Sequence, residues 1–147
     1  MFVPKQAPPR APSSPAPASP KTPQRARGDA GEDAAARYAQ ARGWPLVARN
    51  HRCKRGEIDL IVRDGQTLVF VEVKTRAAPG RGLQAVTWSK RRRLVLASLH
   101  YAGHHRVDLS ATPCRFDVCE VWVGPQGKHQ VRWHERAFDA EGLGLDL

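Results

Sequence analysis

The fold is decided by GEIDLIV at residues 56–62 and by LVFVEVKT at residues 68–75. Both stretches are rich in β-branched and apolar residues, which favours β-strands. The Asp64-Gly65 pair between them is a strong signal for a tight hairpin turn. We therefore predict that the two stretches form neighbouring strands joined by this turn.

Alternation of side chains assigns the residues of each strand to two faces. The apolar faces carry Ile58, Leu60 and Val62 on the first strand and Val69, Val71 and Val73 on the second. The opposite faces carry Glu57, Asp59 and Ile61 on the first strand and Phe70, Glu72 and Lys74 on the second. If the apolar faces coincide, Asp59, Glu72 and Lys74 project together from the other side of the sheet.

Two carboxylates beside one ammonium group suit metal-assisted hydrolysis of a phosphodiester. A divalent ion polarises the phosphoryl oxygen and supplies hydroxide at neutral pH, and Mg²⁺ prefers one or two carboxylates together with waters and phosphate oxygens. Lys74 would stabilise the charge that develops on the phosphate. The alternative is a cross-strand salt bridge on an exposed face. The apolar neighbours of Asp59 and Glu72 weigh against it, because charges close to a core are costly unless they are paired or bind metal.

Length and composition indicate one soluble domain. The chain has 147 residues, 41% of them hydrophobic, which is enough for a single core. It has no run near the roughly 20 apolar residues that cross a bilayer, and its start lacks the apolar segment of a secretory signal. Three cysteines, an odd number, fit reduced thiols. We therefore expect a cytoplasmic protein with no membrane partner.

The net charge of +10 is concentrated in two parts of the chain. Residues 1–28 contain five basic residues and no acidic ones, and residues 37–93 contain fourteen basic and four acidic ones. The second excess coincides with the stretch that carries the carboxylates. A basic surface of this kind attracts nucleic acid. The alternative is an arginine-rich, solvated face without a polyanionic partner.

Residues 1–28 form a low-complexity segment. Eight of the twelve prolines lie between Pro4 and Pro23, and such a segment buries too little apolar area to offset the entropy of ordering it. We predict a disordered tail over residues 1–28 and a domain over residues 29–147. The tail is open to three interpretations: an extension without function, a basic tether for nucleic acid, or a transit peptide.

The domain has the pattern of a mixed α/β or α+β fold. A helix is predicted from near Asp29 to before Gly43, with Glu32 and Asp33 in its first turn, and a second helix over residues 86–102. Strands are predicted over residues 44–52, 56–62, 68–75, 115–123 and 129–134. The order is therefore α-β-β-β-α-β with an extra C-terminal strand, which predicts a mixed sheet flanked by helices.

A basic run begins the second predicted helix: Lys90, Arg91, Arg92 and Arg93. Cations at a helix N-terminus oppose the helix dipole, so another interaction is expected to favour them, and contact with phosphate groups is the natural candidate. Arg76 at the end of the second strand is a further candidate, with a solvated strand end as its alternative. For Trp88 we weigh stacking on a base against covering the core, and expect the core.

Several motifs resemble those of the YraN family, small bacterial proteins related to archaeal Holliday-junction resolvases within the PD-(D/E)xK nuclease superfamily. The resemblance spans about residues 30–123 and rests on Gly31-Glu32, Arg49-Asn50-x-Arg52, residues 56–61, residues 70–76, Ala85-Val86-Thr87 with Lys90, and residues 115–118. Ile58 replaces the proline of the superfamily motif, and His51 stands where an aromatic residue is expected. The resemblance implies a restriction-endonuclease-like fold.

The resemblance also implies roles for individual residues. Asp59 and Glu72 would bind metal, Lys74 would be catalytic, and Glu32 would complete the acidic site from the first helix. The residues themselves leave Glu32 open to a second interpretation, as a partner of the helix dipole. Glu57 is open to two as well, an auxiliary ligand or a partner of Arg55.

We therefore predict a nuclease-like protein that uses Mg²⁺ or Mn²⁺ as an endonuclease on DNA, with structured or branched DNA as a candidate substrate. Nucleic acid is the expected partner, DNA is favoured over RNA, and a homodimer is compatible with the sequence. Two alternatives stay open: a nucleic-acid-binding module on the same scaffold without turnover, and a basic adaptor for an acidic protein.

Overall fold

The computed structural model describes residues 22–80 and 86–140. The helices are α1 (Pro23–Ala41) and α2 (Trp88–His104), and η1 (Pro125–Gly127) is a single 3₁₀ turn. The strands are β1 (Leu46–Cys53), β2 (Gly56–Asp64), β3 (Thr67–Arg76), β4 (Cys114–Val123) and β5 (His129–Phe138). The predicted order α-β-β-β-α-β with an extra C-terminal strand is confirmed.

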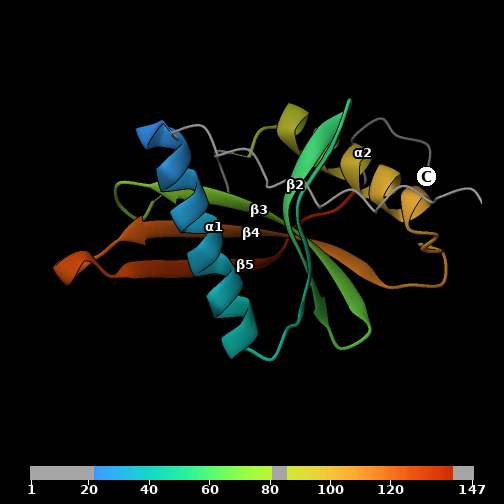
Figure 1. Cartoon of the computed structure of the whole chain (residues 1–147). Helices are drawn as coiled ribbons and strands as arrows, with labels where there is room; N and C mark the ends of the chain where they lie inside the picture. Colours follow the sequence, from blue (N-terminus) through green and yellow to red (C-terminus); the bar gives the residue numbers. More distant parts are fainter. Residues whose placement is uncertain (1–21, 81–85, 141–147) are drawn as a thin grey trace, which may run out of the picture.

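The five strands form one mixed sheet in the order β1-β2-β3-β4-β5. β1, β2 and β3 are antiparallel neighbours, as are β4 and β5, whereas β3 and β4 run parallel. Parallel neighbours need a long crossover, and the segment that contains α2 supplies it (Figure 1). This α+β arrangement is consistent with a restriction-endonuclease-like fold.

Each helix covers one side of the sheet (Figure 1). Small residues of α1, among them Ala35 and Ala39, pack with Leu60, Val62, Val69, Val71, Cys119 and Val121. Leu94, Val95, Ala97 and Tyr101 of α2 pack with Ile58, Ile61, Leu68, Phe70 and Phe116 on the other side. The sheet is therefore buried on both faces around β3, which explains the continuous apolar run of that strand.

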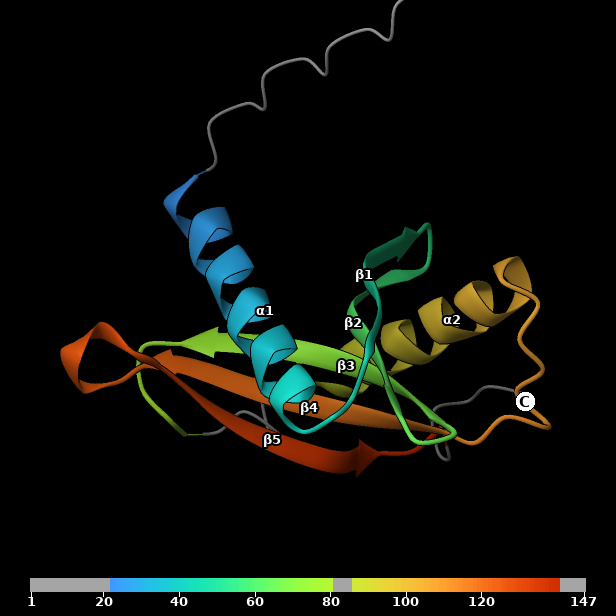
Figure 2. The ribbon, with the colours of Figure 1, turned by 60° about the horizontal axis from the view of Figure 1, so that its bottom comes forward.

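The β1–β2 hairpin separates from the rest of the sheet near Asp59. The ladder between β2 and β3 extends from the turn only as far as Leu60 and Val71, and Figure 2 shows β1 and β2 standing away from the sheet beyond that point. We call residues 50–59 the β1–β2 arm. Its departure creates a fork between β2 and β3.

The side chains of β2 do not alternate between the two faces as predicted where the strand enters the fork. Ile58 was expected to share a face with Leu60 and Val62, but it packs with Ile61 on the α2 side, while Leu60 and Val62 lie on the α1 side. The strand turns where it leaves β3, so strict alternation fails between Ile58 and Leu60. The apolar faces of β2 and β3 nevertheless coincide from Leu60 onward, as predicted.

Helix α1 begins at Pro23, six residues before the predicted start near Asp29. Proline is favourable at the first helical position because its missing N–H needs no partner there, and the alanine and arginine that follow favour a helix. Residues 23–28, which the sequence predicted to lie in the tail, belong to this helix, and residues 1–21 lie outside the described part of the chain. Ala41 ends the helix two residues before Gly43, whose φ of +77° suits glycine.

Two glycines allow close approach of the elements around the fork. A side chain at Gly31 of α1 would collide with Thr75 of β3, and a Cβ at Gly56 in the arm would lie 2.5 Å from the carbonyl oxygen of Arg93 in α2. The arm and α2 are thus in direct backbone contact. No helix in the described residues is long and apolar enough to cross a membrane.

Candidate active site

Asp59 lies at the fork, where its side chain makes a hydrogen bond to β3 in place of the main-chain ladder that ends at Leu60 and Val71. Its Oδ2 accepts a hydrogen bond of 2.8 Å from the main-chain N–H of Val73. Burial, together with the nearby carboxylates of Glu72 and Glu32, raises the pKa of Asp59 to about 8, although the Val73 hydrogen bond lowers it. Asp59 and Glu72 face one another within hydrogen-bonding reach. The fork therefore concentrates carboxyl groups in a poorly solvated place.

Glu72 and Lys74 of β3 form an ion pair on the α2 side of the fork. Lys74 Nζ lies 3.0 Å from Glu72 Oε1, and each side chain is 18% exposed. Burial opposes the charge of Lys74, but the Glu72 carboxylate outweighs it, so the pKa of Lys74 is raised. Lys74 is therefore a fixed cation beside the two carboxyl groups, as the strand pattern predicted.

Glu32 reaches the same region from α1. It lies in the third turn of the helix that starts at Pro23, so the interpretation as a partner of the helix dipole is wrong. Its Oε2 is buried, lies 3.6 Å from Arg49 Nη2, and has no hydrogen-bond partner among the residues that the structure describes. Burial raises the pKa of Glu32 despite Asn50 and Arg49, which both lower it. The structure thus brings Glu32, Asp59, Glu72 and Lys74 together.

The chemistry of these groups fits a hard divalent cation. Within residues 22–80 and 86–140, no group of three or more His, Cys, Asp or Glu side chains is arranged so that it could hold a metal ion by itself. Mg²⁺ does not require one, because it keeps several waters and binds through one or two carboxylates together with phosphate oxygens. The raised pKa of Asp59 and the buried Oε2 of Glu32, which accepts no hydrogen bond and has Arg49 only at 3.6 Å, indicate carboxyl groups whose charge is incompletely compensated. A cation among Asp59, Glu72 and Glu32 would remove that deficit.

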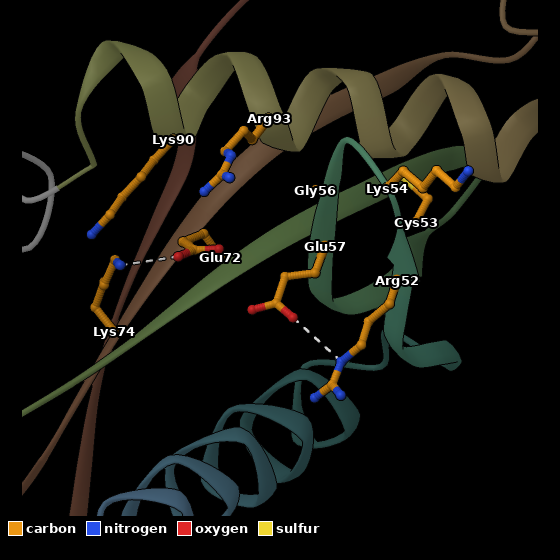
Figure 3. A pocket seen from close by; sticks show the side chains of 9 residues that line it. All are labelled: Arg52, Cys53, Lys54, Gly56, Glu57, Glu72, Lys74, Lys90 and Arg93. Carbon is orange, nitrogen blue, oxygen red and sulfur yellow. Dashed lines mark ion pairs between the residues drawn. The ribbon is translucent and has the colours of Figure 1, made fainter.

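A pocket of about 430 Å³ opens in front of Glu72 and Lys74. Figure 3 shows its two walls: the tip of the β1–β2 arm and the start of α2. Its lining side chains are Arg52, Cys53, Lys54 and Glu57 of the arm, Glu72 and Lys74 of β3, and Lys90 and Arg93 of α2. Cations outnumber carboxylates on this surface, so the pocket favours an anionic occupant.

The basic run at the start of α2 divides between the pocket and the core. Lys90 and Arg93 line the pocket, and Lys90 lies beside Lys74, which lowers its pKa. Arg91 turns away: its Nε donates to the Val86 carbonyl at 2.9 Å and its guanidinium stacks over Phe138. Arg92 is half-buried outside the pocket lining. The predicted phosphate contact therefore has support in position for Lys90 and Arg93 but not for Arg91.

Three further side chains singled out in the sequence, those of Arg76, Glu57 and Trp88, lie outside the group of Glu32, Asp59, Glu72 and Lys74. Arg76 lies on β3 near enough to Lys90 to lower its pKa, on the pocket side. Glu57 is paired with Arg52 at 3.3 Å, not with Arg55, and its side chain is 59% exposed. Trp88 is 55% exposed, so the expectation that it covers the core is wrong. An exposed aromatic ring two residues before Lys90 leaves base stacking as its alternative.

The sequence assigned no role to Arg49 and Asn50, which both contact the carboxyl group of Glu32. Arg49 bridges Glu32 and Asp33, with a 2.8 Å contact from its Nη1 to Asp33 Oδ1, and Asn50 hydrogen-bonds to Glu32. Asn50 adopts φ of +52° at the start of the arm. Their place in the Arg49-Asn50-x-Arg52 motif was the available signal, but only the fold shows that they lie against α1.

The matching family profile and the similar proteins all belong to one protein family. The profile of the uncharacterised protein family UPF0102 matches residues 31–121. A UPF0102 protein of Symbiobacterium thermophilum is 51% identical over 116 residues, covering 77% of this chain and 96% of the relative. UPF0102 proteins of Ralstonia nicotianae and Aeromonas hydrophila are 43% and 46% identical, covering 79% and 73% of this chain and 88% and 80% of the relatives. The matched range contains the whole fork.

Proposed function

The chain belongs to the uncharacterised protein family UPF0102, the YraN family, and we propose that it is a metal-dependent nuclease-like protein that acts on DNA. The observation that carries the proposal is the convergence of Glu32, Asp59 and Glu72 at the fork beside Lys74. A structural salt bridge would join each carboxylate to a cation, whereas at this fork Asp59 and Glu72 face one another directly. Carboxyl groups that face one another, with the pKa values of Asp59 and Glu32 raised, are typical of a functional site and suit a metal ion.

Asp59 and Glu72 would hold Mg²⁺ or Mn²⁺, with Glu32 as the third acidic group. When bound, the ion would polarise the scissile phosphate and supply a nucleophile at neutral pH. Asp59 must lose its proton first, and its hydrogen bond from Val73 N–H fixes the direction of its remaining lone pairs. Glu72 is held by Lys74, so both ligands enter the reaction with a defined orientation.

Lys74 would stabilise the negative charge that develops on the phosphate. Its pKa is raised, so it stays protonated at neutral pH and acts as an electrostatic group, not as a base. Lys90 lies beside it, and two adjacent ammonium groups repel one another unless an anion lies between them. A phosphodiester passing through the pocket would supply that anion.

The walls of the pocket would contact the backbone of the nucleic acid. Arg52 and Lys54 approach from the arm, and Lys90 and Arg93 approach from α2. Such contacts position a substrate without reading its sequence. The preference for DNA over RNA, and for structured or branched DNA, rests on the resemblance of the motifs to resolvase-like nucleases.

A nucleic-acid-binding module without turnover is the second candidate. This candidate is favoured by the metal-free state of the fork, in which Asp59 is protonated and Glu72 forms an ion pair with Lys74. In that state the pocket is a basic surface and the carboxyl groups are largely neutralised. This candidate predicts binding that depends on salt and not on metal.

One assay separates these functions. Full-length protein is incubated with linear duplex, single-stranded and four-way-junction DNA and with RNA, each with Mg²⁺, Mn²⁺ or chelator. We expect cleavage that requires metal. We also expect an affinity for the cleaved nucleic acid that falls as the salt concentration rises. Salt-sensitive binding without cleavage of any substrate would leave the binding module, and absence of binding to every nucleic acid would overturn both.

A further inference from the structure

Four of the six histidines gather where the β1–β2 arm meets the end of α2. His51 is on β1, His100 and His104 are on α2, and His105 follows the helix. His51 Nε2 and His100 Nδ1 are 3.0 Å apart, and their ring centroids are 5.1 Å apart. The rings of His104 and His105 lie 6.1 Å from His100 and 6.5 Å from His51, respectively. None of these four histidines, which we call the histidine patch, lines the pocket in front of Glu72 and Lys74.

The separation of the two facing nitrogens suits a shared metal ion. Zinc–nitrogen bonds of about 2.0–2.1 Å at a tetrahedral angle place two ligand nitrogens roughly 3.3 Å apart. His51 Nε2 and His100 Nδ1 are within a few tenths of an ångström of that separation, so a small ring rotation converts their hydrogen bond into a chelate. His100 is exposed, which leaves the pair open to a cation from solution.

The surroundings of His51 also favour a metal cation over a proton. Burial lowers the pKa of His51, and the neighbouring His100, His105 and His104 lower it further. A neutral imidazole is the form that binds metal. Nitrogen ligands select borderline cations such as Zn²⁺, Ni²⁺ and Cu²⁺, whereas Mg²⁺ prefers oxygen.

We propose that His51 and His100 form a two-imidazole site for a borderline divalent cation, Zn²⁺ in the first place, with water completing its coordination. No group of three or more His, Cys, Asp or Glu side chains in the described residues could hold a metal ion, so the site is an open two-imidazole chelate and not a structural zinc cage. The proposal does not depend on nuclease activity.

The position of the chelate gives it a consequence for the pocket. His51 belongs to the same strand as Arg52 and Cys53, which line the pocket, and the arm touches α2 again where Gly56 meets Arg93. A cation that links His51 to His100 fixes the arm to α2 at a second point. Zn²⁺ therefore stabilises the native arrangement of the wall that faces the candidate active site.

Two measurements on the full chain test the proposal. Calorimetric titration measures the affinity for Zn²⁺, and thermal unfolding in Zn²⁺ or chelator measures the change in stability. Wild-type protein should bind Zn²⁺ and unfold at a higher temperature in Zn²⁺ than in chelator, with no such shift from Mg²⁺ at the same concentration. His51→Phe keeps an aromatic ring against Tyr101, whose centroid is 5.2 Å away, and His100→Gln changes an exposed side chain. Either variant removes a direct ligand, so it should lose more Zn²⁺ affinity than the roughly 10- to 100-fold that loss of an outer-shell partner costs.

Matched controls identify the ligands. His129→Gln changes a histidine of β5 and should bind Zn²⁺ as wild type does, and Cys53→Ser tests the nearby thiol. A native circular dichroism spectrum and an unchanged metal-free midpoint show that each variant has folded. The proposal is overturned if wild type shows no Zn²⁺ shift, if the double variant His51→Phe/His100→Gln binds as tightly as wild type, or if Cys53→Ser alone removes binding.

Discussion

The Asp59 carboxylate accepts a 2.8 Å hydrogen bond from the main-chain N–H of Val73, at the point where β2 leaves β3. A side chain thus completes the hydrogen bonding of a strand whose neighbour has departed. The same contact holds an acidic group in the fork, where burial and the other carboxylates raise its pKa to about 8. Fold geometry and site chemistry are coupled through this one residue.

Asp59 should make the metal-free protein less stable as pH rises from 7 to 8. Its folded pKa of about 8 exceeds the ordinary value of 3.8, so the folded state binds more protons than the unfolded state between those values, and stability falls with pH until the folded pKa is passed. Urea unfolding in chelator should show the decline in wild type.

The matched variant for that measurement is Asp59→Asn, because the amide oxygen can still accept from Val73 N–H while the titrating proton is gone. Its stability should change less between pH 7 and 8 than that of wild type. An equal decline in Asp59→Asn and wild type would show that Asp59 does not titrate in this range.

Binding of Mn²⁺ or Mg²⁺ should release protons at pH 7. Asp59 is largely protonated there in the metal-free fork, and a carboxyl group must be deprotonated to coordinate a metal. Calorimetric titration in two buffers of different ionisation enthalpy measures the release, which should approach one proton for each ion bound. Identical binding enthalpies in both buffers would contradict a protonated Asp59.

Gly56→Ala should destabilise the attachment of the arm to α2. The new Cβ would lie 2.5 Å from the Arg93 carbonyl oxygen, so the backbone must shift, at a cost of roughly 1–3 kcal/mol. Chemical unfolding measures the loss. Gly103→Ala is the control: it meets nothing within 4 Å inside α2, and alanine should stabilise that helix by up to about 1 kcal/mol. Equal effects of the two substitutions would contradict the close approach.

Removing residues 1–21 should weaken nucleic-acid binding without abolishing it. The deletion ends before α1 begins at Pro23 and removes Lys5, Arg10 and Lys21. Each lost phosphate contact reduces the slope of log affinity against log salt by about 0.9 for duplex DNA. Binding isotherms at several salt concentrations measure both quantities. Complete loss of binding would show that the basic surface of residues 22–140 is not the main interface.

The sequence was sufficient for much of the site because strand patterns are local. The β2–β3 turn and the apolar faces placed Glu72 and Lys74 correctly, and Asp59 lies beside them as predicted. The alternation rule failed at Ile58, because it assumes that β2 stays paired with β3, and the departure of the arm depends on packing against α2. The start of α1 was missed because a proline-rich composition masked a proline that is compatible with the first helical position.

Contacts between distant segments were beyond the sequence. Arg49 and Asn50 reach Glu32 only because β1 folds back against α1. His51 and His100 are 49 residues apart and belong to different kinds of element, so no periodicity connects them. Arg91 shares a run with Lys90 and Arg93, but its helical position turns it toward Phe138.

The most direct test of the proposed nuclease is the rate of metal-dependent cleavage by Glu72→Gln compared with Glu57→Gln. Both substitutions remove one carboxylate that lines the same pocket, but Glu57 is exposed and paired with Arg52, whereas Glu72 faces Asp59. With Mg²⁺ or Mn²⁺ and the DNA that wild type cleaves best, Glu72→Gln should lose at least about 100-fold in rate, on the scale of a lost electrostatic catalytic group, while it still binds DNA. Glu57→Gln should cleave within a few-fold of wild type. Equal rates for Glu72→Gln and wild type, or no metal-dependent cleavage by wild type on any DNA or RNA, would contradict the assignment of the fork as a nuclease site.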